Sequence, residues 1–351
     1  MKNSFYLLLL ISGILFTGCD KEEIIQDSSD YSAELSNIGS NVILETYKQL
    51  AAASADLLTA TQKLQDDPTA QNLEDAQNAW KNTRSYWEQS EGFLFGPVDQ
   101  EGIDPAIDSW PLDVATLNNM LSSSNNLTVD FLSHQEDNVK GFHVIEYLLW
   151  GENGQKTIDQ FTTREFEYLS ASTGLLAKDT KKLYNLWDPA QGNFIKNILT
   201  AGNGSNLYIS QKSALEEIAT ALANIADEVA NGKIEDPFTQ QNITLEESRF
   251  SSNSKEDFAN NIRSIQNIYS GNFLTTGNGK GLSAIVKNIN PNLDQTITNQ
   301  IKDAIQAILD INGTFSEAVT NQDQSVRTAQ EKIRDLQSTL EESLIPLINN
   351  L

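Results

Sequence analysis

Apolar side chains recur at helical spacing in almost every long segment of this 351-residue chain, and no segment shows sustained strand alternation. One stripe begins with Leu35, Ile38 and Val42. A later stripe begins with Leu215 and Ile218. Residues three and four positions apart lie on one face of an α-helix, and an apolar face must be buried against another element. Because only helices are available to cover these faces, the sequence predicts an all-α fold.

The predicted helices fall into two sets of about four with short connections, a pattern typical of antiparallel four-helix bundles packed together. The Gly/Asn-rich residues 192–204 are the predicted boundary region, so the expected bundles span residues 31–200 and 201–351. Trp80-Lys81-Asn82-Thr83-Arg84 resembles Asn260-Asn261-Ile262-Arg263 in the second half. One interpretation of this echo is a duplicated four-helix unit.

The first eighteen residues have the pattern of a secretory signal peptide. Lys2 is followed by an apolar run over residues 5–16, and then by Thr17 and Gly18. A charged start, a short apolar run and small residues before a cleavage point are typical of an exported protein. The run is too short for a spanning helix. We therefore expect residues 1–18 to be a signal peptide, and the residues around Cys19 make it a lipoprotein signal peptide.

Leu15-Phe16-Thr17-Gly18-Cys19 resembles the lipobox of bacterial lipoproteins, in which the cysteine becomes the lipidated first residue of the mature chain. Cys19 is the only cysteine, so a disulfide within one chain is impossible, whereas acylation accounts for a lone exported cysteine. The alternative is an unmodified cysteine at an ordinary cleavage site. No later stretch approaches the roughly 20 apolar residues of a spanning helix, so membrane attachment is expected through the Cys19 lipid alone.

Residues 19–30 are predicted to form a lipidated tether. Asp20-Lys21-Glu22-Glu23 resembles the acidic export signals that send Bacteroidetes lipoproteins to the outer face of the outer membrane. This resemblance implies an outer-membrane lipoprotein at the cell surface, with a periplasm-facing position as the alternative. A simple solvated, charged tether is a further interpretation, and it is compatible with both positions.

The formal net charge of the chain is −24. A chain this acidic repels phosphate backbones and anionic lipid, so no nucleic-acid partner is expected, and cations are the favoured ligands. The alternative is that the charge only keeps the protein soluble at a cell surface.

Residues 141–151 hold the most informative local pattern. His143, one of two histidines in the chain, lies three positions before Glu146 within an otherwise apolar segment that ends at Gly151. On a helix the imidazole and the carboxylate would project from one face into a buried space. Such a pair is a satisfied core pair, an acid/base pair or two ligands of a metal ion.

The predicted helix over residues 70–91 carries polar groups on its apolar stripe. Arg84 and Glu91 lie in line with Trp80 and Trp87, and Glu88 flanks them. Charged groups on an apolar stripe need partners, so this helix is expected to face something other than plain core.

These two helices suggest half of a metal site with nitrogen and oxygen ligands. His143 and Glu146 supply two ligands, and Glu88 or Glu91 and Asp179, from the predicted helix over residues 163–187, are candidate ligands from neighbouring helices. Carboxylates with one imidazole and no thiolate suit iron, manganese or zinc better than copper(I).

Other chemistry is poorly supported. A zinc peptidase needs two histidines on one helix, but His134 lies nine residues upstream of His143 in a polar segment. The chain has no Gly-x-Ser-x-Gly nucleophile pattern. Gly277-Asn278-Gly279-Lys280-Gly281 lacks the spacing and the ending of a phosphate-binding loop.

Several pieces in order resemble the imelysin family of bacterial iron-regulated envelope proteins, over about residues 35–345. The pieces are Trp80-x-x-x-Arg84 with Glu88 and Glu91, Phe95-Gly96-Pro97, Ile107-Asp108-Ser109-Trp110-Pro111, Gly141-Phe142-His143-Val144-Ile145-Glu146, Ser248-Arg249-Phe250-Ser251, and Asn261-Ile262 to Ile268-Tyr269-Ser270-Gly271.

The resemblance implies two four-helix bundles with a site in the cleft between them, and a role in iron uptake through binding of iron or an iron-containing ligand such as haem. Carried over by position, the metal ligands would be His143, Glu146, Glu88, Glu91 and Asp179, and the lining residues Trp80, Arg84, Trp110, Asp113 and Arg249. The alternative is core packing for the aromatic residues and a salt bridge between the bundles for the two arginines.

Three functions follow as hypotheses. The first is an iron-binding lipoprotein that works with an outer-membrane iron or haem transporter. The second is a metallopeptidase built on the His-x-x-Glu motif, the class to which family members were once assigned. The third is a module that binds haem or a receptor. Iron is the expected metal, with zinc or haem as alternatives.

Overall fold

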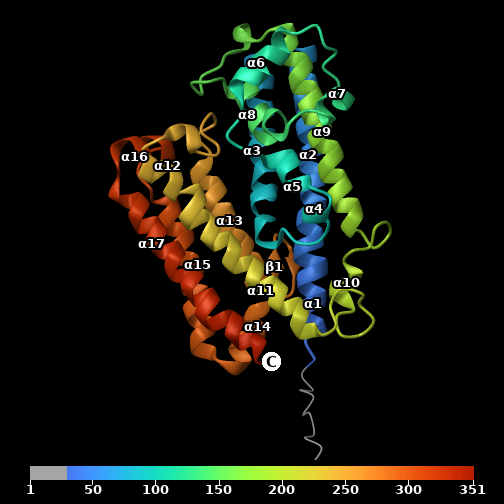
Figure 1. Ribbon diagram of the computed structural model, residues 1–351, viewed down its shortest axis with the longest axis vertical. Helices are drawn as coiled ribbons and strands as arrows, with labels where there is room; N and C mark the ends of the chain where they lie inside the picture. Colours follow the sequence, from blue (N-terminus) through green and yellow to red (C-terminus); the bar gives the residue numbers. More distant parts are fainter. Residues whose placement is uncertain (1–29) are drawn as a thin grey trace, which may run out of the picture.

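The computed structural model describes residues 30–351 (Figure 1). The predicted signal peptide over residues 1–18 and Cys19, with nearly all of the predicted tether, lie outside the described residues. Within residues 30–351 almost all regular structure is helical, so the all-α prediction is confirmed. No helix in that part of the chain is long and apolar enough to cross a membrane.

The elements up to residue 200 include two long helices, α3 and α9, whose bounds lie close to those predicted from the helical spacing of apolar residues. In chain order the elements are α1 Ser32–Asn37, the π-helix η1 Ile38–Ile43, α2 Leu44–Asp66, α3 Ala70–Glu88, the 3-10 turn η2 Glu91–Phe93, α4 Pro97–Gln100, α5 Ile103–Asp108, α6 Val114–Ser122, α7 Val129–Ser133, η3 Asp137–Val139, α8 Phe142–Trp150, η4 Ile158–Gln160, α9 Thr163–Trp187 and α10 Lys196–Leu199.

The remaining elements are again nearly all helical. They are α11 Gln211–Glu228, the π-helix η5 Val229–Lys233, α12 Glu235–Gln240, η6 Ile243–Leu245, α13 Ser254–Ser270, β1 Asn272–Phe273, β2 Thr276–Gly277, α14 Leu282–Ile289, α15 Pro291–Leu309, α16 Phe315–Asn321, α17 Gln324–Thr339, the π-helix η7 Leu340–Leu344 and α18 Ile345–Asn349.

The long helix α2 packs along both α3 and α9. Local sequence explains where these helices begin. Thr69 caps α3 by accepting a hydrogen bond from the Asn72 backbone N–H, and Thr162 and Glu165 form a capping box at the start of α9. Their inward faces bury large side chains, among them Tyr47 and Trp187, whose ring centroids lie 5.6 Å apart.

A second group of helices consists of α11, α13, α15 and α17, in which α15 packs on α13 and α17, and α17 packs on α11. Figure 1 shows this group beside the lower part of α2, α3 and α9. The two groups meet where α3 contacts α13, and where η2 contacts α11 and α13. The division at residue 200 into two four-helix bundles, and their origin by duplication, stay predictions.

Residues 92–111, which read as a loop because they are rich in Gly, Pro and Asp, contain the short helices α4 and α5. Burial of Val98, Ile103 and Ile107 against the core stabilises these turns, so tertiary packing overrides local propensity. The consequence for function is direct, because α5 ends at Asp108, which is buried in the site described below.

The Gly-rich residues 271–281 contain a small antiparallel hairpin, in which Asn272 pairs with Gly277 and Phe273 with Thr276. The sequence did not predict this hairpin, because strands of two residues are too short to show alternation.

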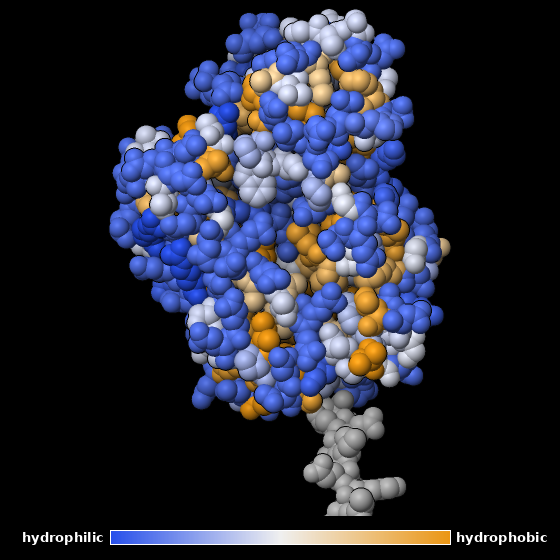
Figure 2. Space-filling model, viewed as in Figure 1, coloured by the Kyte–Doolittle hydropathy of each residue, from blue (hydrophilic) through white to orange (hydrophobic). Residues whose placement is uncertain are grey.

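The visible surface is mostly hydrophilic, and its apolar side chains gather in small separate areas (Figure 2). This distribution agrees with the formal net charge of −24. The strongly polar groups that concern function lie instead inside the molecule.

Candidate metal centre

Gly141 sets the position of α8 against α5. Its φ is +78°, and a Cβ atom on this residue would lie 2.2 Å from the backbone oxygen of Ile107. Only glycine permits both the left-handed backbone and this close approach. The contact brings His143, two residues into α8, beside Asp108, the residue after Ile107.

His143 is buried between two carboxylates. Its Nε2 atom lies 3.2 Å from Asp108 Oδ1, and its Nδ1 atom lies 3.3 Å from Glu146 Oε2. Burial disfavours the imidazolium, but the two carboxylates outweigh burial and raise the pKa of His143 to about 9. The ring is therefore protonated at neutral pH when no metal ion competes for it.

Glu146 is held by the chain that precedes α13. Its Oε1 atom accepts hydrogen bonds from the backbone N–H and the hydroxyl of Ser251, both at 2.7 Å. Its other oxygen faces His143 Nδ1. A carboxylate in this position orients the imidazole and sets which ring nitrogen carries a proton, as in the outer shell of many metal sites. Glu146 is thus better placed to orient His143 than to bind a metal ion itself.

Arg84, fully buried on α3, contacts four carboxylates. Its guanidinium forms ion pairs with Asp108, with Glu88 at 2.5 Å and with Glu247 at 2.7 Å, and its Nε atom lies 3.8 Å from Asp257. Burial opposes ionisation of Asp108, but the Arg84 charge and His143 hold its pKa well below the usual range. Trp87 Nε1 also donates to Asp108 Oδ2 at 2.6 Å.

Lys233, the last residue of η5, adds a second buried cation. Its Nζ atom lies 2.8 Å from Glu247 Oε1, 2.9 Å from Glu91 Oε2 and 3.7 Å from Glu88 Oε2. Burial raises the pKa of both Glu88 and Glu91, although Lys233 opposes the rise.

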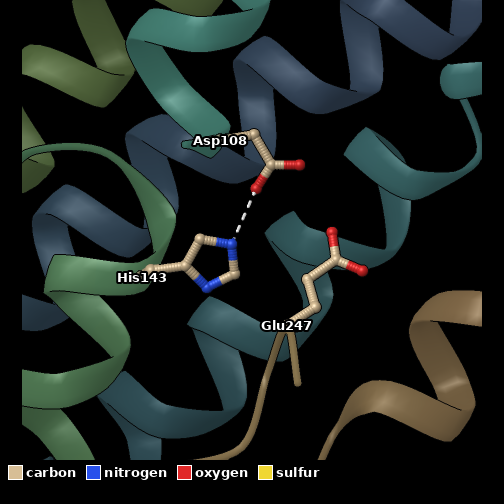
Figure 3. A group of neighbouring side chains, drawn as sticks. All are labelled: Asp108, His143 and Glu247. Carbon is tan, nitrogen blue, oxygen red and sulfur yellow. Dashed lines mark ion pairs between the residues drawn. The ribbon is translucent and has the colours of Figure 1, made fainter. Parts of the chain in front are cut away.

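Two sets of donors are close enough for each to hold one ion. One set is Asp108, His143 and Glu247, and the other is Glu88, Glu91 and Asp108; in each, the donor atoms lie within 4.8 Å of one another. Figure 3 shows the side chains of the first set converging from α5, α8 and the segment after η6. Among residues 30–351, Glu247 Oε2 has no hydrogen-bond partner, and His143 Nε2 has only the ion pair with Asp108 at 3.2 Å. The first set therefore has one carboxylate oxygen without a partner.

A pocket of about 310 Å³ opens beside this first set. Its lining residues are Trp110, Pro111, Leu112, His143, Thr244, Glu246, Glu247, Arg249 and Phe250. Among these, His143, Glu246 and Glu247 are buried side chains. Arg249 stacks on the Phe250 ring at 4.1 Å and pairs with Glu152 at 2.9 Å near the surface.

The structure brings together four of the five predicted metal ligands, His143, Glu146, Glu88 and Glu91, in one buried cluster. Asp179 is not part of the cluster. It is partly exposed on α9, where the nearby charges are Lys178, Lys140 and Lys182.

Three of the five predicted lining residues lie at the cluster or its pocket, and two lie elsewhere. Arg84 lies in the cluster, and Trp110 and Arg249 line the pocket. Trp80 instead packs in the core, where its Nε1 atom donates to the Phe142 backbone oxygen at 3.0 Å. Asp113 caps α6 by accepting a hydrogen bond from the Thr116 backbone N–H.

Four charged residues of the cluster were missed from the sequence: Asp108, Lys233, Glu247 and Asp257. Asp108 lies within Ile107-Asp108-Ser109-Trp110-Pro111 and Glu247 directly precedes Ser248-Arg249-Phe250-Ser251, so both touch pieces that already resembled the family. We found no local signal for Lys233 or Asp257.

The protein is thus an all-α protein that buries a cluster of one imidazole and several carboxylates between two groups of helices. Residues 43–340 match the family model described as imelysin. The chain belongs to the imelysin family, and the resemblance in its motifs is confirmed.

Known relatives agree with this assignment. The chain is 31% identical over 311 residues to iron-regulated protein A of Synechococcus elongatus, covering 88% of this chain and 84% of that protein. It is similar to the crystal structure of a putative iron-regulated protein A precursor from Parabacteroides distasonis, with a TM-score of 0.80 and 28% identity. The match covers 91% of this chain and 94% of that chain. An imelysin-like protein from Psychrobacter arcticum, at 14% identity and a TM-score of 0.71, shares the fold over 91% of this chain and 95% of its own.

Proposed function

We propose that this protein binds an iron ion through Asp108, His143 and Glu247, as its cargo in iron uptake. One observation carries the proposal: an imidazole nitrogen of His143 and carboxylate oxygens of Asp108 and Glu247 lie within 4.8 Å of one another, and within residues 30–351 the buried Glu247 Oε2 atom has no hydrogen-bond partner. Buried polar atoms normally find a partner, so a buried carboxylate oxygen without one, beside an imidazole and a second carboxylate, is a candidate ligand of a cation.

The charges of the cluster favour a cation. Six buried carboxylates meet there, against Arg84, Lys233 and the His143 imidazole; the carboxylates are Glu88, Glu91, Asp108, Glu146, Glu247 and Asp257. Excess buried negative charge must be neutralised by protons or by a positive ligand. The pKa values of Glu88, Glu91 and Asp257 are raised, so in the metal-free protein protons neutralise part of this charge. A bound metal ion would take the place of these protons.

The donor set fits iron by type. It offers one imidazole nitrogen and carboxylate oxygens without any thiolate, which suits iron, manganese or zinc. The names of the relatives, iron-regulated protein A, favour iron among these metals. The adjoining pocket leaves room for water or for the ligands of an iron carrier to complete the coordination.

The peptidase alternative is less well supported. A metallopeptidase needs a carboxylate free to take a proton from water. Glu146, the glutamate of the motif, is occupied on one oxygen by Ser251 and faces His143 with the other. Haem is also disfavoured, because its iron would have to reach a nitrogen of a side chain that is only 2% exposed.

We further propose that the protein works as an outer-membrane lipoprotein at the cell surface, anchored by a lipid on Cys19, and passes iron to an outer-membrane transporter. This part rests on the sequence of residues 1–30 and on the family's iron-related names.

The test is equilibrium dialysis of the purified, tag-free protein against ferrous iron without oxygen and against ferric iron, followed by element analysis. We expect His143→Ala and Glu247→Gln to remove most of the bound iron. His134→Ala and Asp179→Asn serve as controls, since neither residue lies in the cluster, and both should bind like the unmodified protein. Equal binding by His143→Ala and the unmodified protein would contradict the proposal, and so would loss of binding in the Asp179→Asn control.

A further inference from the structure

Lys233 lies beside two members of the second donor set, Glu88 and Glu91, and beside Glu247 of the first set. Its ammonium lies within 2.9 Å of Glu91 and Glu247, and 3.7 Å from Glu88, while its Nζ atom lies 5.2 Å from the centre of the Trp110 ring. The residue is 3% exposed and belongs to the π-helix η5. A π-helix inserts an extra residue into a helix and often marks a functional position.

The second donor set, Glu88, Glu91 and Asp108, would suit a metal ion by itself. Asn261 reinforces it, because its Nδ2 atom donates to Glu88 at 2.5 Å and to Glu91 at 2.8 Å. Among the residues that the structure describes, the buried Asn261 Oδ1 atom accepts no hydrogen bond, while Glu88 Oε1 lies 2.5 Å from Arg84 Nη2. Oxygen atoms of this kind are the ligands that hard cations prefer.

We propose that the Lys233 ammonium is the resident cation of this second set, and that it limits the protein to one bound metal ion. Loss of that ammonium would open a second position for a divalent cation between Glu88, Glu91 and Asp108. This inference builds on the proposed function, in which the first ion binds to Asp108, His143 and Glu247.

Lys233 suits this role better than Arg84. An ammonium is a compact charge with freely directed donors, much like a small ion, whereas a guanidinium is a flat fork. Arg84 spans Glu88, Asp108, Glu247 and Asp257, which lie on different elements, and a single ion could not replace all of these contacts. Lys233 gathers its carboxylates around one atom.

Glu247 links the two donor sets. Its Oε1 atom receives both Lys233 at 2.8 Å and Arg84 at 2.7 Å, which leaves Oε2 for the first metal ion. Lys233 therefore pairs with Glu88 and Glu91 of the second set and holds a ligand of the first set, Glu247. A fixed positive charge also repels a second metal ion at this short range, because the medium is of low polarity.

The experiment counts Mn²⁺ ions bound per chain by dialysis and element analysis. We expect about one ion in the unmodified protein and about two in Lys233→Ala, because manganese accepts the same oxygen and nitrogen donors. In His143→Ala we expect about none, and in the double variant His143→Ala/Lys233→Ala about one, bound at the second set. Lys156→Ala is the matched control, since the Lys156 side chain is 8% exposed and pairs with one carboxylate, Glu165, at 2.7 Å.

The outcomes separate the two proposals. If the unmodified protein binds no ion but Lys233→Ala binds one, the proposed function fails and the inference stands. The inference is overturned if the unmodified protein already binds two ions, or if the double variant binds none.

Folding of the variants is part of the test, because an uncompensated carboxylate cluster is destabilising. Lys233→Ala and Lys233→Gln are therefore prepared with Mn²⁺ present, and Mn²⁺ should raise their melting temperatures more than that of Lys156→Ala. If neither Lys233 variant folds even with Mn²⁺, the ion does not replace the ammonium and the proposal is wrong.

Discussion

Glu146 on α8 accepts two hydrogen bonds from Ser251, a residue 105 positions later in the chain, through the backbone N–H and the hydroxyl, both at 2.7 Å. The same carboxylate faces His143 Nδ1 at 3.3 Å. The glutamate of the Gly-x-His-x-x-Glu motif therefore joins the histidine to the segment before α13. We therefore expect Glu146 to position the histidine.

Replacing Glu146 by Gln should weaken metal binding without abolishing it. Loss of an outer-shell carboxylate typically costs about 10–100-fold in metal affinity, because the imidazole is then less basic and less well oriented. Ser251→Ala removes one of the two hydrogen bonds and should cost less. Titration calorimetry measures both effects. Glu152→Gln is the control, because Glu152 forms an exposed ion pair with Arg249 outside the buried cluster. An unchanged affinity in Glu146→Gln would contradict the positioning role.

Metal affinity should rise with pH. His143 has a pKa of about 9 in the metal-free protein and Asp257 one of about 7, so a metal ion must displace protons from the cluster at neutral pH. Each displaced proton makes affinity change about tenfold per pH unit below the relevant pKa. Binding isotherms between pH 6 and pH 8 check this, and His143→Ala should show a shallower dependence in whatever weak binding it retains. A flat profile would contradict it.

The stability of the metal-free protein should fall as pH rises. Both groups have folded pKa values above their ordinary values of 6.5 for His143 and 3.8 for Asp257, so the folded state binds more protons than the unfolded state. Their contribution is full below the ordinary values and is lost as pH rises through about 7 for Asp257 and about 9 for His143. Urea denaturation at several pH values measures the trend, which should be weaker in His143→Asn.

Arg84→Met should be strongly destabilising. The change leaves Glu88, Asp108 and Glu247 without a buried cation that contacts all three. Removing one partner of a buried ion pair typically costs about 3–5 kcal/mol. Arg263→Ala is the matched control, since Arg263 forms an exposed pair with Glu256 and should change the unfolding free energy by less than about 1 kcal/mol. Similar losses in the two variants would show that the buried network contributes little.

Gly141→Ala should disrupt both the fold and the site. The added Cβ would lie 2.2 Å from the Ile107 oxygen, at a φ of +78°, and relief of this clash must separate α8 from Asp108. Gly102→Ala is the control, because Gly102 also has a positive φ, +59°, but no described atom lies within 4 Å of its added Cβ. The control should lose about 1–2 kcal/mol from backbone strain alone. Gly141→Ala should lose more, and should also bind less iron.

Much of the fold could be predicted because helical period is a local property. The stripe over residues 163–187 predicted the same bounds that α9 has, and the expected helix over residues 70–91 is α3, Ala70–Glu88, followed by the short η2 turn. The spacing of apolar residues did not predict the short helices within residues 92–111, because these helices form through packing against the core.

The site was predicted in part for the same reason. His143 with Glu146, and Arg84 with Glu88, are neighbours on single helices, so spacing revealed them. Spacing did not show which way each helix turns relative to the others. Asp179 and Asp113 were therefore plausible members that the structure places elsewhere.

The sequence by itself determined the all-α class, the family and the central His-x-x-Glu pair, since helical spacing and local motifs express all three. Only the tertiary structure decided that Asp108, Lys233, Glu247 and Asp257 join them. These residues come from the short helix α5, the π-helix η5, the loop after η6 and the helix α13. Their meeting depends on how the two groups of helices dock, which is governed by packing between residues far apart in the chain.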